Sequence, residues 1–323
     1  PMPAACPRRF RPLCRLERLG AKGGRLDWAA HAETWPNAER SRFLHVRPHR
    51  WHVQEFGAPD APVVLLLHGA GGATHSWRDI APALAQPYRV IAPDLPGQGF
   101  TRLGALQRSS LELMADDSAA LLRKIGVAPA AIVGHSAGGA LALRLAQILP
   151  QRPAALVGVN AALENFEGAA GIFFPMMAKA LAMNPFAAPA MARLAQAGTV
   201  ERLISGTGSR LDPTGLALYR ACIADSAHID GTLTMMAQWR LSRLWSDLRR
   251  IEAPTLLLAG AEDRAVPPAT AERAAARLPH GRAEILPGLG HLAHEEAPAE
   301  VGARIAAFLA AHIPGGQANA VAT

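Results

Sequence analysis

The sequence predicts an α/β fold, in which a mostly parallel sheet is flanked by helices and carries an inserted helical cap. Strand-like apolar runs alternate with helix-like runs, as expected for parallel strands joined by crossover helices. The alternation stops at residues 161–239, where helical pieces are interrupted by Pro and Gly. We therefore expect a core of residues 40–160 and 240–314, and a cap of residues 161–239.

The core elements follow from the spacing of apolar residues. Two short runs, 43–46 and 51–56, resemble an opening hairpin. The runs with the length of buried strands are 63–68, 90–94, 131–135, 156–160, 255–259 and 283–286. The runs with helical spacing are 111–125, 139–148, 268–278 and 298–313. These elements suffice for a sheet that is covered on both faces.

Charge is concentrated at the start of the chain. Residues 1–27 hold seven Lys or Arg against Glu17 and Asp27, so they supply +5 of the net +7. The remaining body is nearly neutral, which argues against a basic face for nucleic acid. We expect residues 1–30 to be a flexible basic arm and residues 315–323 a disordered tail. The arm is either a plain extension or a weak contact for an anionic membrane or acidic partner.

Three cysteines, Cys6, Cys14 and Cys222, form neither an even disulfide framework nor a metal-binding pair, which favours a reducing compartment. No apolar segment of sufficient length follows the basic N-terminus to make a secretory signal. The most apolar later stretch, 168–178, is also far shorter than the roughly 20 residues that span a bilayer. We expect a soluble, cytoplasmic protein.

Ser136 is the candidate nucleophile. It lies in the GxSxG sequence of residues 134–138, directly after one strand-like run and directly before a helical one. In that context two glycines permit a tight turn that exposes the serine hydroxyl at the start of a helix. The helix N-terminus also favours developing negative charge.

The serine needs a base, and the base needs a carboxylate to orient it. His291 and Asp263 are the candidates, because each follows a predicted strand at the end where parallel sheets place their sites. Glu262 is the rival acid and His294 the rival base. Asp263 is favoured because it opens a loop to the next helix, and His291 because it follows a glycine-rich turn.

The loop after residue 68 is the candidate for stabilising negative charge on a substrate oxygen. Its HGAGG sequence lets the backbone approach closely, so we expect the Ala70 amide to pair with the Ala137 amide in an oxyanion hole. We expect no cofactor. The sequence has neither GxGxxG nor GxxxxGK[ST], and His291-x-x-His294 lacks a third metal ligand elsewhere.

The cap segment holds six of the eight methionines together with several aromatic residues. Such adaptable side chains suit either ordinary packing or the wall of a large apolar pocket. The predicted pocket residues are Phe173, Phe174, Met177, Met236 and Trp239.

These motifs together resemble the α/β-hydrolase superfamily over residues 40–313. The resemblance rests on the GxSxG turn, the HG loop, APDLPGQG at 92–99, Asp263 and Gly290-His291. The segments 50–54, 74–78, 206–209, 235–239 and 286–296 resemble the BchO group, which is described as magnesium-chelatase accessory proteins of bacteriochlorophyll synthesis. This resemblance implies a cytoplasmic protein acting in or near porphyrin metallation. Gln98 departs from the histidine of many superfamily members.

The predicted activity is an esterase-like serine hydrolase that acts on an apolar substrate. Epoxide hydrolase and dehalogenase chemistry in this superfamily need an aspartate nucleophile, whereas this chain has Ser136. Haloperoxidase and carbon–carbon hydrolase chemistry use the same three residues and stay open. The alternative is a non-catalytic accessory protein that holds a porphyrin. The sequence does not indicate an oligomeric state.

Overall fold

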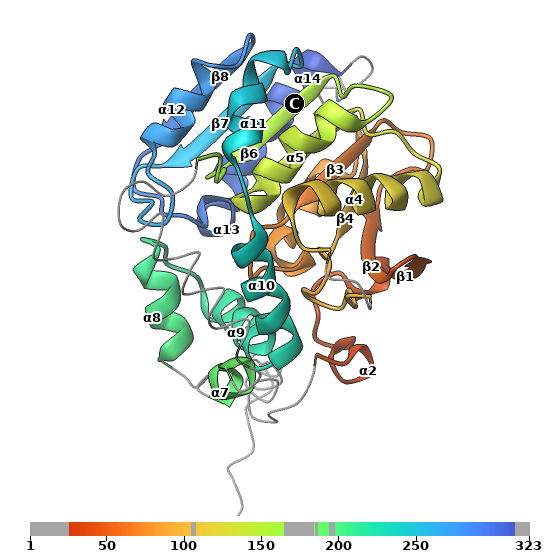
Figure 1. Ribbon diagram of the computed structural model, residues 1–323, viewed down its shortest axis with the longest axis vertical. Helices are drawn as coiled ribbons and strands as arrows, with labels where there is room; N and C mark the ends of the chain where they lie inside the picture. Colours follow the sequence, from red (N-terminus) through yellow and green to blue (C-terminus); the bar gives the residue numbers. More distant parts are fainter. Residues whose placement is uncertain (1–25, 105–107, 165–183, 185–186, 194–197, 314–323) are drawn as a thin grey trace, which may run out of the picture.

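One sheet of eight strands organises the molecule, in the order β1-β2-β4-β3-β5-β6-β7-β8 (Figure 1). The computed structural model describes residues 26–104, 108–164, 184, 187–193 and 198–313. β1 (Ser41–Val46) and β2 (His49–Phe56) form the predicted hairpin, and β2 also pairs antiparallel with β4 (Arg89–Pro93). All later neighbours pair in parallel. The predicted fold class is confirmed.

The remaining strands match the apolar runs to within two residues. They are β3 (Val63–Leu67), β5 (Ala131–His135), β6 (Ala155–Val159), β7 (Thr255–Gly260) and β8 (Gly281–Leu286). β8 begins earlier than predicted because it is the edge strand, with one neighbour and side chains that are mostly only partly buried. Polar residues such as Arg282 and Glu284 can therefore belong to it.

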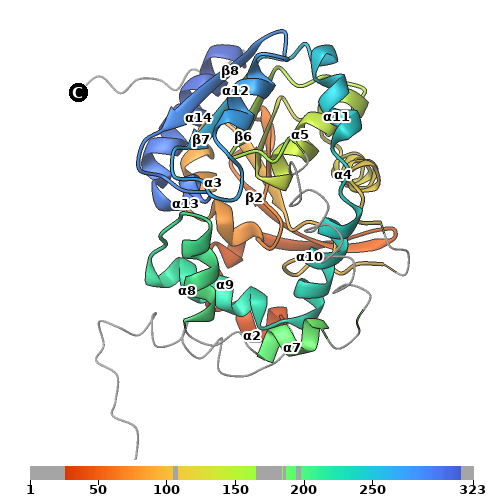
Figure 2. The same cartoon turned by 60° about the vertical axis from the view of Figure 1, so that its left-hand side comes forward.

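Helices cover both faces of the sheet (Figure 2). One face packs against α4 (Leu111–Ile125), α5 (Ala137–Ile148), α11 (Ser242–Asp247) and α12 (Ala269–Ala275). The other face packs against α3 (Ile80–Leu84) and α14 (Pro298–His312). α12 is shorter than the predicted 268–278, and α5 starts two residues before the predicted 139.

The side chains of each central strand point alternately to the two faces of the sheet, so the hydrophobic core has two layers. In β3, Leu65 and Leu67 face the α4 and α5 side, while Val64 and Leu66 face the α3 and α14 side. All four side chains are almost fully buried. Because neighbouring residues of a strand point to opposite faces, a continuous apolar run is what a strand covered on both faces requires.

Four helices lie together at one end of the molecule, next to the carboxyl ends of the parallel strands (Figures 1 and 2). They are α7 (Ala187–Arg193), α8 (Thr199–Gly206), α9 (Pro213–Ile223) and α10 (Ser226–Gln238), and no strand occurs in the described part of 161–239. Pro213 is the first residue of α9, in agreement with the prediction that proline separates the helical pieces. Pro189 was expected to break a helix, but it lies in the first turn of α7, where its missing N–H costs little.

The beginning of the described chain is packed against the body. Leu26 is fully buried, and its amide donates to Asp225 Oδ2 at 3.0 Å. The short helix α2 (Trp28–His31) and Trp35 belong to the same region, where Trp28 and Trp35 contact the ring of Phe100. The expected flexible arm of residues 1–30 is therefore wrong for its last residues. Residues 1–25 and the predicted tail lie outside the described residues.

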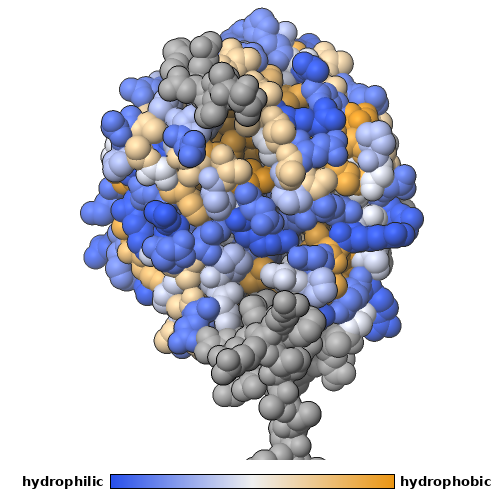
Figure 3. All heavy atoms as spheres, turned by 180° about the vertical axis from the view of Figure 1, so that it is seen from behind, coloured by the Kyte–Doolittle hydropathy of each residue, from blue (hydrophilic) through white to orange (hydrophobic). Residues whose placement is uncertain are grey.

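Short elements complete the chain. They are the 3₁₀ turns η2 (Ala38–Arg40), η3 (Thr74–Trp77) and η4 (Leu248–Arg250) and the single-turn helix α13 (Ala293–Glu296). Seen from behind, the surface mixes hydrophilic and hydrophobic side chains, with hydrophilic ones across its middle (Figure 3). Within the described residues, no helix combines the length and apolar character needed to cross a membrane.

Candidate active site

Ser136 lies between the last residue of β5 and the first residue of α5, in a backbone conformation that L residues rarely adopt. Its φ is 50° and its ψ is −117°. The surrounding backbone holds it there, because the Ser136 amide donates to Val159 O and Ser136 O accepts from Gly139 and Ala162. Such strained residues cluster at functional sites. The turn thus has the conformation that the GxSxG context predicted.

The two glycines of the motif are required by close backbone contacts. A Cβ atom on Gly134 would lie 2.1 Å from Gly138 O, and a Cβ atom on Gly138 would lie 2.2 Å from Leu67 O. Both distances are far below van der Waals contact. Glycine at these positions therefore lets β5, the start of α5 and the end of β3 approach one another.

His291 bridges the serine and the carboxylate. It lies in the loop after β8, with Nε2 3.0 Å from Ser136 Oγ and Nδ1 2.8 Å from Asp263 Oδ2. A carboxylate accepts, so Nδ1 carries the hydrogen and Nε2 is left to accept from the serine hydroxyl. The structure brings together the three side chains predicted as nucleophile, base and acid.

Asp263 is held from both of its oxygens. Oδ1 accepts from the amides of Ala265 and Val266 at 2.8 Å, and Oδ2 accepts from Asn160 Nδ2 at 2.7 Å as well as from His291. Asp263 is buried, whereas the rival acid Glu262 is exposed. These donors fix the orientation of the carboxylate, and Asp263 rather than Glu262 is the carboxylate that bonds to His291.

Asn160 contributes to the site although its sequence context did not reveal it. It follows β6 with a positive φ of 47°, and its amide group also donates to Gly290 O at 3.2 Å. It therefore connects the loop of Asp263 to the loop of His291. The available signal was its place at the carboxyl end of a central strand, next to the strand that leads into Ser136.

The rival base His294 faces a different set of groups. It is buried in α13, and its Nε2 donates to Ser76 Oγ at 2.9 Å. Ser76 in turn donates to Glu295, which also accepts from Tyr219 and Arg78. Burial lowers the pKa of His294 to about 3. His294 and Glu295 thus share Ser76 as a partner, whereas His291 bonds to Ser136 and Asp263.

His135, the variable residue of the GxSxG motif, bonds to the backbone of the candidate base. It is buried, and its Nε2 donates to the backbone carbonyl of His291 at 2.9 Å. Its ring also contacts the rings of His291 and His294, with centroids 4.9 and 4.3 Å apart. Burial first, then the neighbouring histidines, place its pKa well below the ordinary value, so it is neutral. A residue in the variable position of a motif gave no sequence signal for this contact.

The predicted oxyanion amides, those of Ala70 and Ala137, have no hydrogen-bond acceptor within the part of the chain that the structure describes. Elsewhere in the HG loop, the Gly71 amide donates to Gln98 Oε1 at 2.7 Å, and the Gly72 amide is bonded within the loop. Gln98 therefore has a structural role that its departure from the superfamily pattern did not suggest. The Ala70 amide, unlike those of Gly71 and Gly72, is therefore available to a substrate oxygen, and its place in an oxyanion hole stays a prediction.

Two neutral histidines hold the same loop. His68 donates from Nδ1 to Gly69 O and accepts from the Leu95 amide at Nε2, and burial lowers its pKa to about 4. His228 of α10 donates from Nε2 to Gly71 O at 3.0 Å, and burial lowers its pKa as well. The loop is thus fixed from the core on one side and from α10 on the other.

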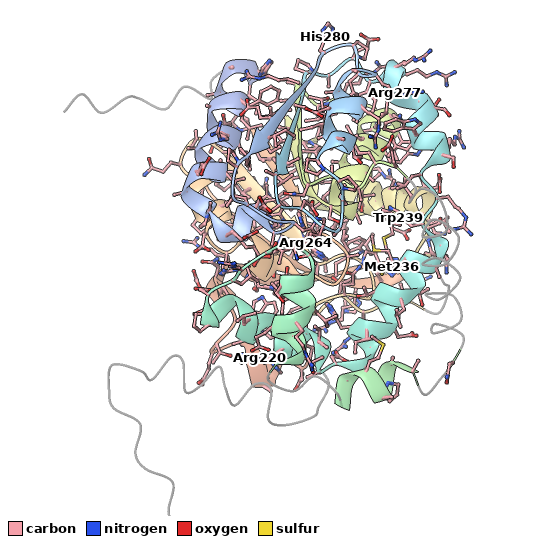
Figure 4. All side chains as sticks on the ribbon, turned by 90° about the vertical axis from the view of Figure 1, so that its left-hand side faces the viewer. Arg220, Met236, Trp239, Arg264, Arg277 and His280 are labelled. Carbon is pink, nitrogen blue, oxygen red and sulfur yellow. The ribbon has the colours of Figure 1, made fainter. Side chains whose placement is uncertain are left out.

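The apolar pocket stays a prediction. Phe173, Phe174 and Met177 lie outside the described residues. Met236 is 39% exposed, and Trp239 is half-buried against the core at the end of α10 (Figure 4). A separate cavity of about 250 Å³ lies before the amino ends of β6 and β7, at the sheet edge opposite Ser136. It is lined by Arg144, Arg152, Arg243 and Arg250, among others, and is remote from the site.

Comparison with known proteins agrees with this fold. The sequence profile described as the alpha/beta hydrolase family matches residues 64–304. The magnesium-chelatase 30 kDa subunit of Rhodobacter capsulatus is 46% identical over 273 residues, covering 84% of this chain and 95% of that protein. A 2-hydroxy-6-oxononadienedioate/2-hydroxy-6-oxononatrienedioate hydrolase of Cupriavidus pinatubonensis is 27% identical, covering 83% and 94%.

A solved structure shows the same fold. The thermophilic esterase of Thermogutta terrifontis superposes with a TM-score of 0.66 at 24% identity, covering 84% of this chain and 99% of that one. The profile match extends over most of the chain, and it includes Ser136, Asp263 and His291. The protein therefore belongs to the alpha/beta hydrolase family.

Proposed function

We propose that the protein is a serine hydrolase that cleaves an ester, or a related acyl bond, of an apolar substrate through an acyl-enzyme on Ser136. The observation that carries the proposal is the continuous chain of contacts from Ser136 Oγ through His291 to Asp263, at 3.0 and 2.8 Å. A hydroxyl next to a correctly oriented imidazole is what nucleophilic catalysis by serine requires. Hydrolases among the relatives support the reaction class.

In the first half-reaction, His291 Nε2 takes the hydroxyl proton while Ser136 Oγ forms a bond to the substrate carbonyl carbon. The Ala70 and Ala137 amides stabilise the negative charge that develops on the carbonyl oxygen. His291 then gives the proton to the leaving alcohol as its bond to carbon breaks, which leaves the acyl group on Ser136. Asp263 stabilises the imidazolium between these two steps.

In the second half-reaction, His291 takes a proton from water while the water oxygen attacks the acyl carbon. The same proton returns to Ser136 Oγ as its bond to carbon breaks, and the carboxylic acid leaves. No metal or other cofactor is needed for either half-reaction, because the side chains supply the proton transfers. The Gly71 contacts to Gln98 and His228 would keep the oxyanion loop in place throughout.

A link to porphyrin or bacteriochlorophyll metabolism is supported by the similarity to a magnesium-chelatase subunit. The proposed substrate is a large apolar ester, such as a porphyrin ester, that enters between the sheet and the α7 to α10 cap. The second candidate function, favoured by the same relative, is a non-catalytic accessory protein that holds a porphyrin for the chelatase. In that case the three aligned side chains would have no reaction to perform.

The two functions differ in what Ser136→Ala does. Turnover of p-nitrophenyl esters of increasing acyl length, and of porphyrin methyl esters, is measured with wild type and with this variant. We expect a loss of at least about 1,000-fold, as for other serine triads. Ser246→Ala is the matched control, because Ser246 is exposed and its hydroxyl bonds only within α11. Porphyrin binding that is equal in both proteins, without any turnover, would favour the accessory function.

A further inference from the structure

Both residues next to His291 have their amides bonded to side chains. The Gly290 amide donates to Glu296 Oε1 at 3.0 Å, and the Leu292 amide donates to Ser209 Oγ at 2.8 Å. Glu296 belongs to α13, whereas Ser209 lies between α8 and α9 among the cap helices. The backbone of the candidate base is thus held on each side, once by the core and once by the cap.

Both residues next to Asp263 are held in a similar way by their backbones. The Glu262 amide donates to Leu289 O at 2.8 Å, and the Arg264 amide donates to Thr207 O at 3.1 Å. Leu289 belongs to the loop of His291, and Thr207 belongs to the same cap segment as Ser209. The acid loop, the base loop and the cap segment therefore share one set of hydrogen bonds.

The segment of residues 207–210 fits closely between the two loops. A Cβ atom on Gly208 would lie 1.9 Å from Glu262 O, and a Cβ atom on Gly290 would lie 2.4 Å from Gly208 C. The second carboxylate oxygen of Glu296 accepts from the Arg210 amide at 3.0 Å. Glu296 therefore joins the base loop to the 207–210 segment. Figure 4 shows Arg264 where this cap region meets the sheet.

Because of these contacts we propose that Ser209 and Glu296 are positioning residues, which fix His291 for proton transfer without touching the substrate. The inference rests on the proposed function of His291 as the base. Ser209 is 1% exposed and Leu292 is 5% exposed, so loss of the hydroxyl leaves a buried amide without its acceptor. The loop would then shift to find a new acceptor, and small displacements of a catalytic group cost large factors in rate.

The expected defect is specific to the chemical step. A displaced base stabilises the transition state less but leaves substrate binding unchanged. We therefore expect kcat to fall while KM is preserved. This outcome differs from a merely structural role, which would lower the amount of folded protein and leave the kcat per active site unchanged. To separate a lower kcat from a smaller amount of folded protein, the rate must be divided by the number of active sites.

The experiment measures p-nitrophenyl acetate hydrolysis per fluorophosphonate-reactive site in full-length wild type, Ser209→Ala, Ser209→Thr and Ser205→Ala. Ser205 is the matched control, because it is an exposed serine of α8 whose hydroxyl bonds to Arg202 O in its own helix. We expect kcat to fall about tenfold or more in Ser209→Ala with KM within about twofold. Ser209→Thr, which keeps the acceptor, restores most of the rate, and Ser205→Ala matches wild type.

Glu296 gives an independent second test. Glu296→Gln keeps one acceptor oxygen for the two amides, whereas Glu296→Ala keeps none, so the loss of kcat should be larger in the alanine variant. Unchanged kcat in both Ser209→Ala and Glu296→Ala, with wild type labelled and active, would overturn the positioning role alone. A wild type that neither reacts with the probe nor hydrolyses any ester would overturn the proposed function and this inference together.

Discussion

His135 Nε2 donates its hydrogen to the backbone carbonyl oxygen of His291 at 2.9 Å, so the residue before the candidate nucleophile holds the candidate base. His135 is buried and neutral because its surroundings lower its pKa. The contact joins the turn after β5 to the loop after β8 independently of the Ser136 hydroxyl. It would therefore keep the two loops at the same spacing in the proposed acyl-enzyme, where the Ser136 hydroxyl no longer bonds to His291.

Replacing His135 by Phe should lower kcat/KM about tenfold and cost roughly 1–3 kcal/mol of unfolding free energy, because the His291 carbonyl loses its donor. The rates are measured with p-nitrophenyl acetate, and stability by urea denaturation. His280→Phe is the control, since His280 is exposed at the end of the molecule far from the site (Figure 4). A His135→Phe variant with wild-type rate and stability would show that the contact has no energetic role.

We expect the protein to lose stability below neutral pH, because buried histidines have lowered pKa values in the folded state. The pKa of His68 is lowered to about 4 and that of His294 to about 3, both mainly by burial. Unfolded histidine titrates near ~6.5, so the unfolded state binds more protons as the pH falls from there. Each histidine should therefore contribute roughly 2 kcal/mol of lost stability between pH 8 and 5.

The measurement for this prediction is the urea midpoint at pH 8, 7, 6 and 5 in wild type and in His294→Gln. The variant cannot bind a proton at that position, so its stability should fall less steeply with decreasing pH. The two proteins are compared by the slope of stability against pH. A constant loss of stability from the missing Ser76 contact does not change that slope. Parallel curves for the two proteins would mean that His294 does not contribute to the acid sensitivity.

Much of this site could be predicted from the sequence, because each predicted side chain follows a strand of a parallel sheet. Ser136, Asp263 and His291 all lie at carboxyl ends, where the geometry of the sheet brings separate loops together. The contacts of Asn160, Ser209 and His135 could not be predicted in the same way. Their partners are mostly backbone groups of distant loops. Because nearly every residue type carries the same backbone groups, the sequence does not show which residues make such contacts.

The limits of periodicity explain the errors in the fold. The flexible arm was expected to reach residue 30 because arginines dominate its composition, yet Leu26 is buried in one cluster with Phe100 and residues of α9, which are distant in sequence. Likewise, β8 begins before its apolar part because an edge strand tolerates polar residues. In both cases tertiary contacts, rather than local pattern, set the boundary.

The predicted pocket can be tested at Met236, which is 39% exposed and so tolerates truncation. Met236→Ala should change the ratio of kcat/KM for long-chain and acetyl esters by roughly 3- to 10-fold, because the variant loses the contacts of a few methylene groups with a long acyl chain. Met191→Ala is the matched control, since Met191 of α7 is similarly exposed and is not one of the five residues named as the predicted pocket. Equal effects of the two substitutions on all esters would remove Met236 from the pocket.

The N-terminal segment can be tested by deleting residues 1–25, which keeps Leu26 and its contact with Asp225. If the basic residues attract an anionic membrane, deletion should reduce sedimentation with anionic vesicles at low salt and leave ester turnover intact. Each basic residue near such a surface contributes about 1 kcal/mol, and salt screens the attraction. Identical sedimentation of both proteins at every ionic strength would leave the segment without this role.

The most direct test of the central claim is covalent labelling by a fluorophosphonate probe, located by mass spectrometry of the digested protein. If His291 activates Ser136 and the Ala70 and Ala137 amides form the oxyanion hole, as proposed, the serine should attack phosphorus as it attacks a carbonyl carbon. We expect one label on the peptide that contains Ser136 and none in Ser136→Ala, with His291→Ala labelled far more slowly. Labelling of Ser136→Ala at the wild-type rate, or no labelling of the wild type, would contradict the account.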